Sequence, residues 1–429
     1  MEGCTITVSR IPIDGFTGAL MAVESFSDGR AVLHGPGGCR NYHSFLSSQL
    51  YPRPAAGDFE KYSQQYFFGQ ARVPCTYVDE EDYINGSEEK IEESLPILCG
   101  IDDSFQVFIR SPGAALIGDN ITDVIDRLGY SDRVLAIEES LISQPFSSSY
   151  DHTIRSVLEW MSPRPGDTVP GTANIMGLPI SSNDWSEGLT DLKALLASMG
   201  IEVLASPGAG CSAEDIRRSV AAEINIAISP EYCSSTAEFY RKEYGIPTVL
   251  CDAGAPVGFD AVEDWVGNVA ASMGKDPRPA LCSVREARAR AFRKIGSLGH
   301  TRHMKCRRFA AMTDSSIALP LTKWLYSYLG MVPASITVDP GEDKGLSRKL
   351  MSFLREAGLE GSGGSNPVDS EVHYVFSDGH TAGMMEMMRA CKKGVGIMAP
   401  NMPKLNMLPR PIYGIAGSMY LLDEIFSAI

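Results

Sequence analysis

The segment HGPGGC at 34 to 39 joins a reactive side chain, Cys39, to a turn with almost no side-chain bulk. It follows the apolar run RAVLH, which predicts a β-strand, and its Gly and Pro residues predict a tight turn into a helix. A cysteine near a helix N-terminus is favoured as a thiolate by the helix dipole and the free N–H groups. Cys39 is therefore suited to bind a metal or attack an electrophile, and the same turn is also suited to cradle a phosphate.

Cys75 is the second candidate, in the segment VPCTYVDEED at 73 to 82, again at the end of a short apolar stretch. Neither cysteine has a C-x-x-C neighbour, so a zinc knuckle is disfavoured and the two thiols would have to meet through the fold. The turn before Cys39 has neither the G-x-x-x-x-G-K-[ST] nor the G-x-G-x-x-G spacing. Because no Walker A motif occurs in the sequence, we expect any use of ATP to belong to a partner.

The composition restricts the class of protein. The 38 Lys and Arg against 53 Asp and Glu give a formal charge of -15, which offers no electrostatic support for binding nucleic acid. The first residues do not have the pattern of a signal peptide, and no apolar stretch is long enough to cross a bilayer. We therefore expect a cytoplasmic protein without a membrane partner. In a reducing compartment its 10 Cys are expected to pack, bind metal or act in catalysis rather than form disulfides.

A repeating pattern of elements predicts the fold. From about Thr172, short apolar runs alternate with helices of about ten residues, and the same rhythm restarts after the basic segment 285 to 308. This alternation is typical of βαβ units and parallel sheets, because each crossover helix covers a sheet face. The first third also contains strand-like runs, RAVLHG, FQVFIR and RVLAIEE, separated by less regular segments. The sequence predicts an α/β protein, and a length of 429 residues suggests two to four domains.

Several motifs together carry a resemblance to a known family. They are HGPGGC at 34 to 39, PCT at 74 to 76 followed by an acidic segment and Asn85-Gly86, LIGDN at 116 to 120, and three later segments at 143 to 161, 246 to 266 and 410 to 417. In order and spacing, over nearly the whole chain, this set resembles the subunits of nitrogenase component 1-type oxidoreductases.

The resemblance implies three Rossmann-like, doubly wound parallel-sheet domains: an N-terminal cluster-binding domain (1–165), a middle domain (166–290) and a C-terminal domain (291–429). It also implies a homologous sister subunit, in a heterotetramer or a homodimer, with an iron–sulfur cluster between the subunits. A separate homodimeric, ATP-hydrolysing 4Fe-4S protein would supply the electrons. Cys39 and Cys75 match two cluster-ligand positions, and we expect His34 and Gly38 to lie beside the cofactor.

One ligand position departs from the family pattern. The family's third cysteine stands six residues before the Gly of the LIGD motif, and that position is Pro112 here. Two thiolates from this chain and two from a partner would satisfy an ordinary 4Fe-4S cluster, whereas an eight-iron cluster wants three thiolates from each side. Cys99 is a possible substitute ligand or a packing residue. His34 either donates a hydrogen bond to the ligand shell or packs under the loop.

A second cofactor is a further possibility in the resemblance, either a metallocofactor or a tetrapyrrole in the subunit cavity. The family's two anchor positions for a large cofactor match Ser229 and Lys404, neither a convincing ligand, and Cys233 one helical turn later is either an altered anchor or a packing residue. Our expectation is a core subunit of a nitrogenase-like two-component reductase, catalytic only in its complex. The alternatives are a scaffold that assembles a metal cofactor or tetrapyrrole without turnover, and a cluster-free structural subunit.

Overall fold

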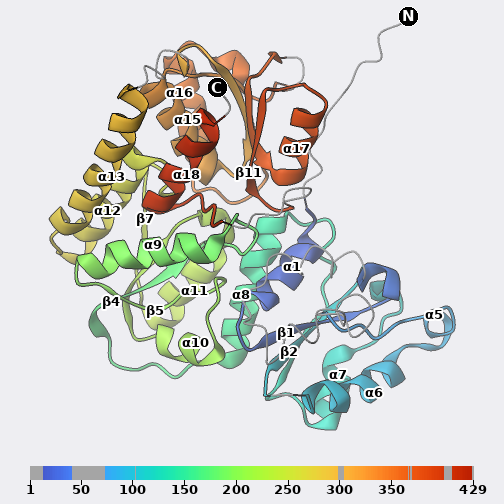
Figure 1. The fold of residues 1–429 in the computed structure, drawn as a ribbon. Helices are drawn as coiled ribbons and strands as arrows, with labels where there is room; N and C mark the ends of the chain where they lie inside the picture. The colour runs from blue at the N-terminus through green and yellow to red at the C-terminus, as the bar shows by residue number, and fades with distance from the viewer. Residues whose placement is uncertain are drawn as a thin grey trace, which may run out of the picture.

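The computed structural model describes residues 13–40, 73–101, 103–297, 304–365, 367, 370–400 and 408–427. Within these residues the strands form three sheets, and every strand pair is parallel (Figure 1). The predicted α/β architecture with three parallel sheets is confirmed. Each sheet carries helices on its faces, as parallel sheets require in order to bury both surfaces.

The first sheet has the order β1-β2-β3, and a short segment at Cys75 extends it beyond β1. Leu33 and Cys75 form a parallel bridge, so this segment takes the place of a strand at the free edge of β1. The elements of this region are α1 (Gly15–Glu24), β1 (Gly29–His34), α5 (Asp82–Asn85), α6 (Glu88–Cys99), β2 (Phe105–Arg110), η1 (Ala114–Leu116), α7 (Ile121–Leu128), β3 (Val134–Ile137) and α8 (Phe146–Met161).

The middle sheet has the order β5-β4-β6-β7, in which the first strand lies between the second and the third. Buried apolar side chains such as Ile175 on β4 and Ile226 on β6 form its centre. Its elements are β4 (Val169–Met176), α9 (Trp185–Ser198), β5 (Glu202–Ala205), α10 (Ala213–Ser219), β6 (Ala222–Ala227), η2 (Pro230–Tyr232), α11 (Ser234–Tyr244), β7 (Thr248–Leu250), α12 (Phe259–Met273) and α13 (Arg278–Ser297).

The third sheet repeats this topology, with the order β11-β10-β8-β9. Its elements are β8 (Arg308–Thr313), α15 (Ser315–Leu329), β9 (Val332–Val338), α16 (Leu346–Glu356), η3 (Glu360–Ser362), β10 (Tyr374–Asp378), α17 (Gly379–Met387), β11 (Lys393–Met398) and α18 (Gly414–Phe426). Counted from the first strand of each sheet, both of these sheets have the spatial order 2-1-3-4. The first sheet has the same order when the Cys75 segment is counted as its second strand.

This shared order places functional positions. In doubly wound sheets, ligands bind outside the carboxyl ends of the strands, close to the point where the strand order reverses. Cys39 follows the first strand of its sheet and Cys75 lies on the second, so their chain ends meet at one edge. The carboxyl ends of the other two sheets are the corresponding places to look for a cavity.

Contacts between elements join the parts of the chain. Helix α1 packs along α8, where Gly15 and Gly18 have no room for a side chain against the backbone carbonyls of Leu141 and Phe146. Helix α18 returns from the end of the chain to pack on α9, α12 and α13 (Figure 1). The three sheets fall within residues 29–137, 169–250 and 308–398. The domain limits expected from the sequence stay a prediction. Among the described residues, no helix has both the length and the apolar character needed to cross a bilayer.

Candidate functional site

The two candidate ligand cysteines lie together at the carboxyl edge of the first sheet. Residues 37 to 40 are helical directly after β1, so Cys39 stands in the first turn of a helix as predicted. The Cys75 segment is hydrogen-bonded along β1 by Leu33 N to Pro74 O (2.8 Å) and Thr76 N to Leu33 O (3.1 Å). The Cys75 thiol donates to the carbonyl oxygen of Gly35 (2.9 Å). Both cysteines are partly exposed, and each is a free thiol.

The protonation of these thiols differs from the sequence-based expectation. Burial raises the pKa of Cys39, and a backbone hydrogen bond only partly opposes it. Burial also raises the pKa of Cys75 to about 12; the Arg40 guanidinium lowers it, and the nearby Cys39 raises it further. The expectation that helix position alone makes Cys39 a thiolate is therefore wrong for the chain by itself, because desolvation dominates. The mutual effect of the two thiols confirms that they are close in space.

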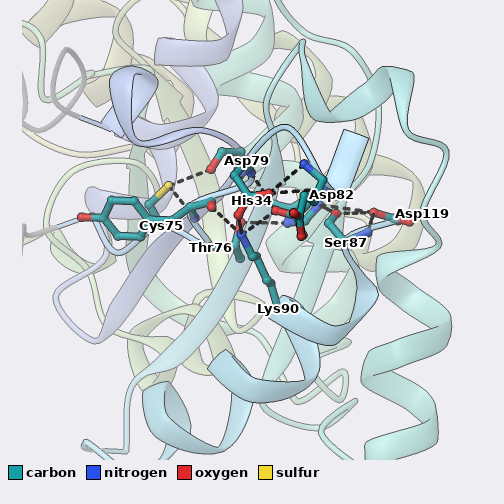
Figure 2. A network of polar contacts seen from close by, with 11 residues as sticks. His34, Cys75, Thr76, Asp79, Asp82, Ser87, Lys90 and Asp119 are labelled. Atoms are coloured by element: carbon teal, nitrogen blue, oxygen red, sulfur yellow. Dashed lines mark hydrogen bonds and ion pairs between the residues drawn. The ribbon is translucent and has the colours of Figure 1, made fainter. Parts of the chain in front are cut away.

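His34 ties the two cysteine-bearing segments together (Figure 2). Its Nδ1 lies 3.0 Å from the Thr76 hydroxyl, beside Cys75, and its Nε2 lies 3.0 Å from the Ser87 hydroxyl. The ring is fully buried, and this burial lowers the pKa of His34 to about 4, against the opposing effect of Asp119. A neutral imidazole therefore fixes the geometry of the loop from below. Of the two roles left open for His34, these contacts favour packing and hydrogen bonding under the loop.

The LIGDN and Asn85-Gly86 motifs have a structural explanation in the same network. Asp119 accepts from the Ser87 backbone N–H (2.9 Å) and from the Ser87 hydroxyl. Gly86 has a φ of 94°, a left-handed conformation that favours glycine, and a Cβ there would lie 3.3 Å from Asp119. Asn120 caps α7 by accepting from the Asp123 N–H (3.0 Å). These residues support the site without being exposed to a ligand.

An ion-pair cluster holds the acidic loop after Cys75. Lys90 on α6 contacts Asp79 (2.7 Å) and Asp82 (2.5 Å) and donates to the Tyr77 carbonyl (2.8 Å) (Figure 2). This arrangement fixes the direction in which the chain leaves Cys75. Sequence reasoning missed Lys90, Thr76 and Ser87, and the only signal for them was the PCT motif beside an acidic segment.

The glycines of the HGPGGC turn differ in what surrounds them. A Cβ on Gly35 would collide with the Ser111 side chain, and one on Gly37 would lie 2.9 Å from the Tyr77 ring. A Cβ on Gly38 would meet nothing within 4 Å, so Gly38 faces open space next to Cys39. Beyond it, Pro112 occupies the third ligand position, and the Tyr83 hydroxyl lies 2.5 Å from a Cβ placed on the adjoining Gly113.

The two weaker candidate ligands lie elsewhere. Cys99 ends α6 and packs with Ile91, Leu95 and Val32 in a separate apolar cluster. Cys233 is 2% exposed and donates to the Ser229 carbonyl (3.4 Å) at the start of α11. In the part of the chain that the structure describes, no group of three or more His, Cys, Asp or Glu side chains is arranged to hold a metal ion. Lys404 lies outside the described residues.

A cavity of about 460 Å³ opens where the carboxyl ends of the middle and C-terminal sheets face the segment before α8. Its wall combines Ser181 and Tyr232 of the middle region with Asp314, Asp339 and Met398 of the last third. The Tyr232 hydroxyl donates to Asp314 (3.0 Å) across this junction. Asp14 and the segment at 142 to 147 close the remaining side. The sequence did not predict this wall, because residues from three distant parts of the chain build it.

The whole chain matches one family model. From residue 15 to residue 429 it matches the model described as nitrogenase component 1 type oxidoreductase. The chain belongs to the nitrogenase component 1-type oxidoreductase family. The resemblance read from the motifs is confirmed, and members of this family carry iron–sulfur clusters and work in multi-subunit complexes.

Curated relatives match this family member over part of its length. One subunit of the light-independent protochlorophyllide reductase of Halorhodospira halophila (strain DSM 244 / SL1) is 26% identical over 203 residues, covering 43% of this chain and 38% of that protein. The subunit of the same name from Rhodospirillum rubrum is 29% identical over 120 residues, covering 28% and 21%. The chain thus spans well under half the length of these relatives.

Solved structures agree with the fold. The chain superposes on a structure described as "Nitrogenase Cp1 at pH 6.5" with a TM-score of 0.76 and 16% identity, covering 100% of this chain and 95% of that one. A second structure, "Nitrogenase Cp1 at pH 5", gives a TM-score of 0.69 at 15% identity, covering 98% and 91%. At this identity the likeness establishes the fold alone.

Proposed function

We propose that this chain is a core subunit of a nitrogenase-like two-component reductase, in which an ATP-dependent iron–sulfur protein supplies electrons. The observation that carries the proposal is the pair of partly exposed thiols, Cys39 and Cys75, at one sheet edge. They would hold half of a 4Fe-4S cluster, and a homologous sister subunit would provide the other ligands. When bound, the cluster would relay electrons one at a time.

The residues around the pair fit such a shared cluster. Gly38 leaves open space beside Cys39, and the described residues offer no third thiol at this edge. His34 and Lys90 hold the two segments in place from the protein side, so the thiols face outward from a fixed frame. Iron binding would release both thiol protons, because thiolates are the ligands.

An exposed apolar rim supports a sister subunit as the occupant of this edge. Ile84 and Leu116 are 84% and 85% exposed, and Tyr77 and Tyr83 are 50% and 40% exposed. Tyr77 lies against Gly37, Tyr83 lies over Gly113, and Ile84 follows Tyr83 on α5. Apolar side chains gathered around a half-built metal site are typical of a surface that is covered in the assembly. The sister subunit would cover the rim and the cluster together.

The assembly is tested by disrupting this rim. We expect Leu116→Glu or Ile84→Glu to prevent association with the sister chain, as measured by anaerobic size-exclusion chromatography with light scattering. Ile97→Glu is the matched control, since Ile97 is 64% exposed but lies near the far end of α6. If the rim variants assemble as well as the control, the proposed interface is wrong.

The cavity of about 460 Å³ is the proposed place of reduction. Turnover separates this function from the alternative, a scaffold that carries a cofactor or tetrapyrrole without reducing it. The purified complex would be assayed with the ATP-dependent reductase, ATP and dithionite, with protochlorophyllide as the first probe. Electron consumption that requires ATP and Cys75 supports the reductase; a complex that carries and releases a chromophore but never consumes electrons supports the scaffold.

A further inference from the structure

Glu231 is a carboxyl group buried in the interior with only half of its hydrogen-bonding capacity used. It is 2% exposed, in the short helix η2 between β6 and α11. Its Oε1 accepts from the Ser315 hydroxyl (2.7 Å) and from the Ser316 backbone N–H (2.9 Å). Its Oε2 has no hydrogen-bond partner among the described residues. A buried carboxylate oxygen without a donor is costly, whereas a protonated one is not.

Glu231 lies in the wall between two cavities. Its chain neighbour Tyr232 lines the first cavity, and its other neighbour Pro230 lines a second cavity of about 540 Å³. Across the wall, a Cβ on Gly341 would lie 3.2 Å from Glu231 Cγ and 2.9 Å from the Ser147 hydroxyl. Gly341 itself stands between Pro340, which lines the first cavity, and Glu342, which lines the second.

The charged groups around Glu231 are mostly acidic. Burial raises the pKa of Glu231, and the hydrogen bonds from Ser315 and Ser316 only partly offset this. Asp314 and Asp339 lie beyond Tyr232, and Asp151 lies beyond Cys233, with Lys344 as the nearby base. Most of these charges disfavour an additional anion at Glu231.

A hydroxyl connects Glu231 to the surface. Ser315 donates to Glu231 and also lies within hydrogen-bonding reach of Asp343. Burial acts to raise the pKa of Asp343, but hydrogen bonds from Ser347, Gly345 and the Ser315 hydroxyl outweigh it, so the pKa is lowered. Asp343 is only partly buried and stands in the loop that lines both cavities. A proton arriving at Asp343 can therefore be handed inward through one intervening hydroxyl.

We propose that Glu231 stores a proton between the two cavities, releases it to the first cavity, and is recharged from Asp343 through Ser315. The use of that proton rests on the proposed reductase function: one electron arriving by way of the cluster and one proton from Glu231 add to the bound substrate. Glu231 is left as a carboxylate. It then takes the Ser315 proton, and Ser315 takes one from Asp343, which solvent reprotonates.

Infrared spectroscopy tests the storage and the route without substrate or iron. In the purified chain at neutral pH, we expect a C=O band of a protonated carboxylic acid that shifts in D₂O. The band should be missing from Glu231→Gln and present in Glu238→Gln, a control at an exposed carboxylate of the second cavity. Ser315→Ala should slow the exchange of this proton with D₂O by roughly a hundredfold. Glu231→Asp, which keeps a titratable group, serves if Glu231→Gln does not fold.

Two results would overturn the proposal. No band assignable to Glu231 at neutral pH would show that no proton is stored, and exchange unaffected by Ser315→Ala would show that the route is different. Failure of the reductase function would leave both measurements intact, because neither uses turnover. Turnover that persists unchanged in Glu231→Gln would remove the relay while leaving the reductase function standing.

Discussion

Replacing His34 by Gln is expected to remove an acid sensitivity from the cysteine-bearing edge of the first sheet. Burial lowers the pKa of His34 to about 4, from 6.5 for a free side chain. The unfolded loop therefore binds a proton more readily than the folded one. The stabilisation is complete above pH 6.5, is lost as the pH falls toward 4, and changes no further below that.

The magnitude follows from the difference in pKa. At 1.36 kcal/mol per pKa unit, the full loss is about 3 kcal/mol, and about 2 kcal/mol of it has occurred at pH 5. In a local opening reaction, about 2 kcal/mol corresponds to a roughly 30-fold loss of protection from hydrogen exchange. Gln has no titratable group, so the variant is less protected at pH 7 but has a flat response to pH.

The assay is hydrogen exchange measured by mass spectrometry at pH 7 and pH 5, corrected for intrinsic rates. The reporting amides are Leu33, Thr76 and Val78, which are hydrogen-bonded between β1 and the Cys75 segment. His152→Gln, at an exposed position on α8, is the matched control and should behave as wild type. Equal pH dependence in wild type and His34→Gln would refute the assignment of this sensitivity to His34.

Two further predictions concern the same edge. Gly35→Ala should lower the free energy of unfolding by about 1–3 kcal/mol in urea titrations, because its Cβ would collide with Ser111. Gly38→Ala should change that free energy by less than about 0.5 kcal/mol, because its Cβ would meet nothing within 4 Å; a similar loss in both variants would contradict this packing. Since burial raises the pKa of both Cys39 and Cys75, the apparent affinity for Fe²⁺ should rise about tenfold per pH unit for each thiol proton displaced, and about a hundredfold for two. Chelator competition between pH 6.5 and 8 measures this, and a pH-independent affinity would mean that the thiols are not the ligands.

The strand-turn-helix interpretation of the HGPGGC segment was correct because local chemistry decides it. Gly and Pro punctuate the chain after an apolar run, and residues 37 to 40 are helical as predicted. The meeting of Cys39 with Cys75 also follows from general rules, since consecutive parallel strands tend to lie side by side with their carboxyl ends at one edge.

Other features of the site depend on distant contacts that no local pattern specifies. The thiolate expectation failed because the burial of Cys39 and Cys75 is a tertiary property that outweighs helix position. The contact of Tyr232 with Asp314 joins residues 82 positions apart, and that of Glu231 with Ser315 joins residues 84 positions apart. The cavity wall and the buried carboxyl behind it were therefore visible only in the folded chain.

The central claim is that Cys39 and Cys75 together hold iron. Its most direct test is iron and sulfide analysis with EPR on the anaerobically purified complex, comparing wild type with Cys39→Ser and Cys75→Ser. Cys282→Ser, at an exposed cysteine on α13, is the control. We expect either ligand variant to lose the cluster and its signal while the control keeps both; a full complement of iron with an unchanged signal in Cys39→Ser or Cys75→Ser would show that these thiols do not hold it.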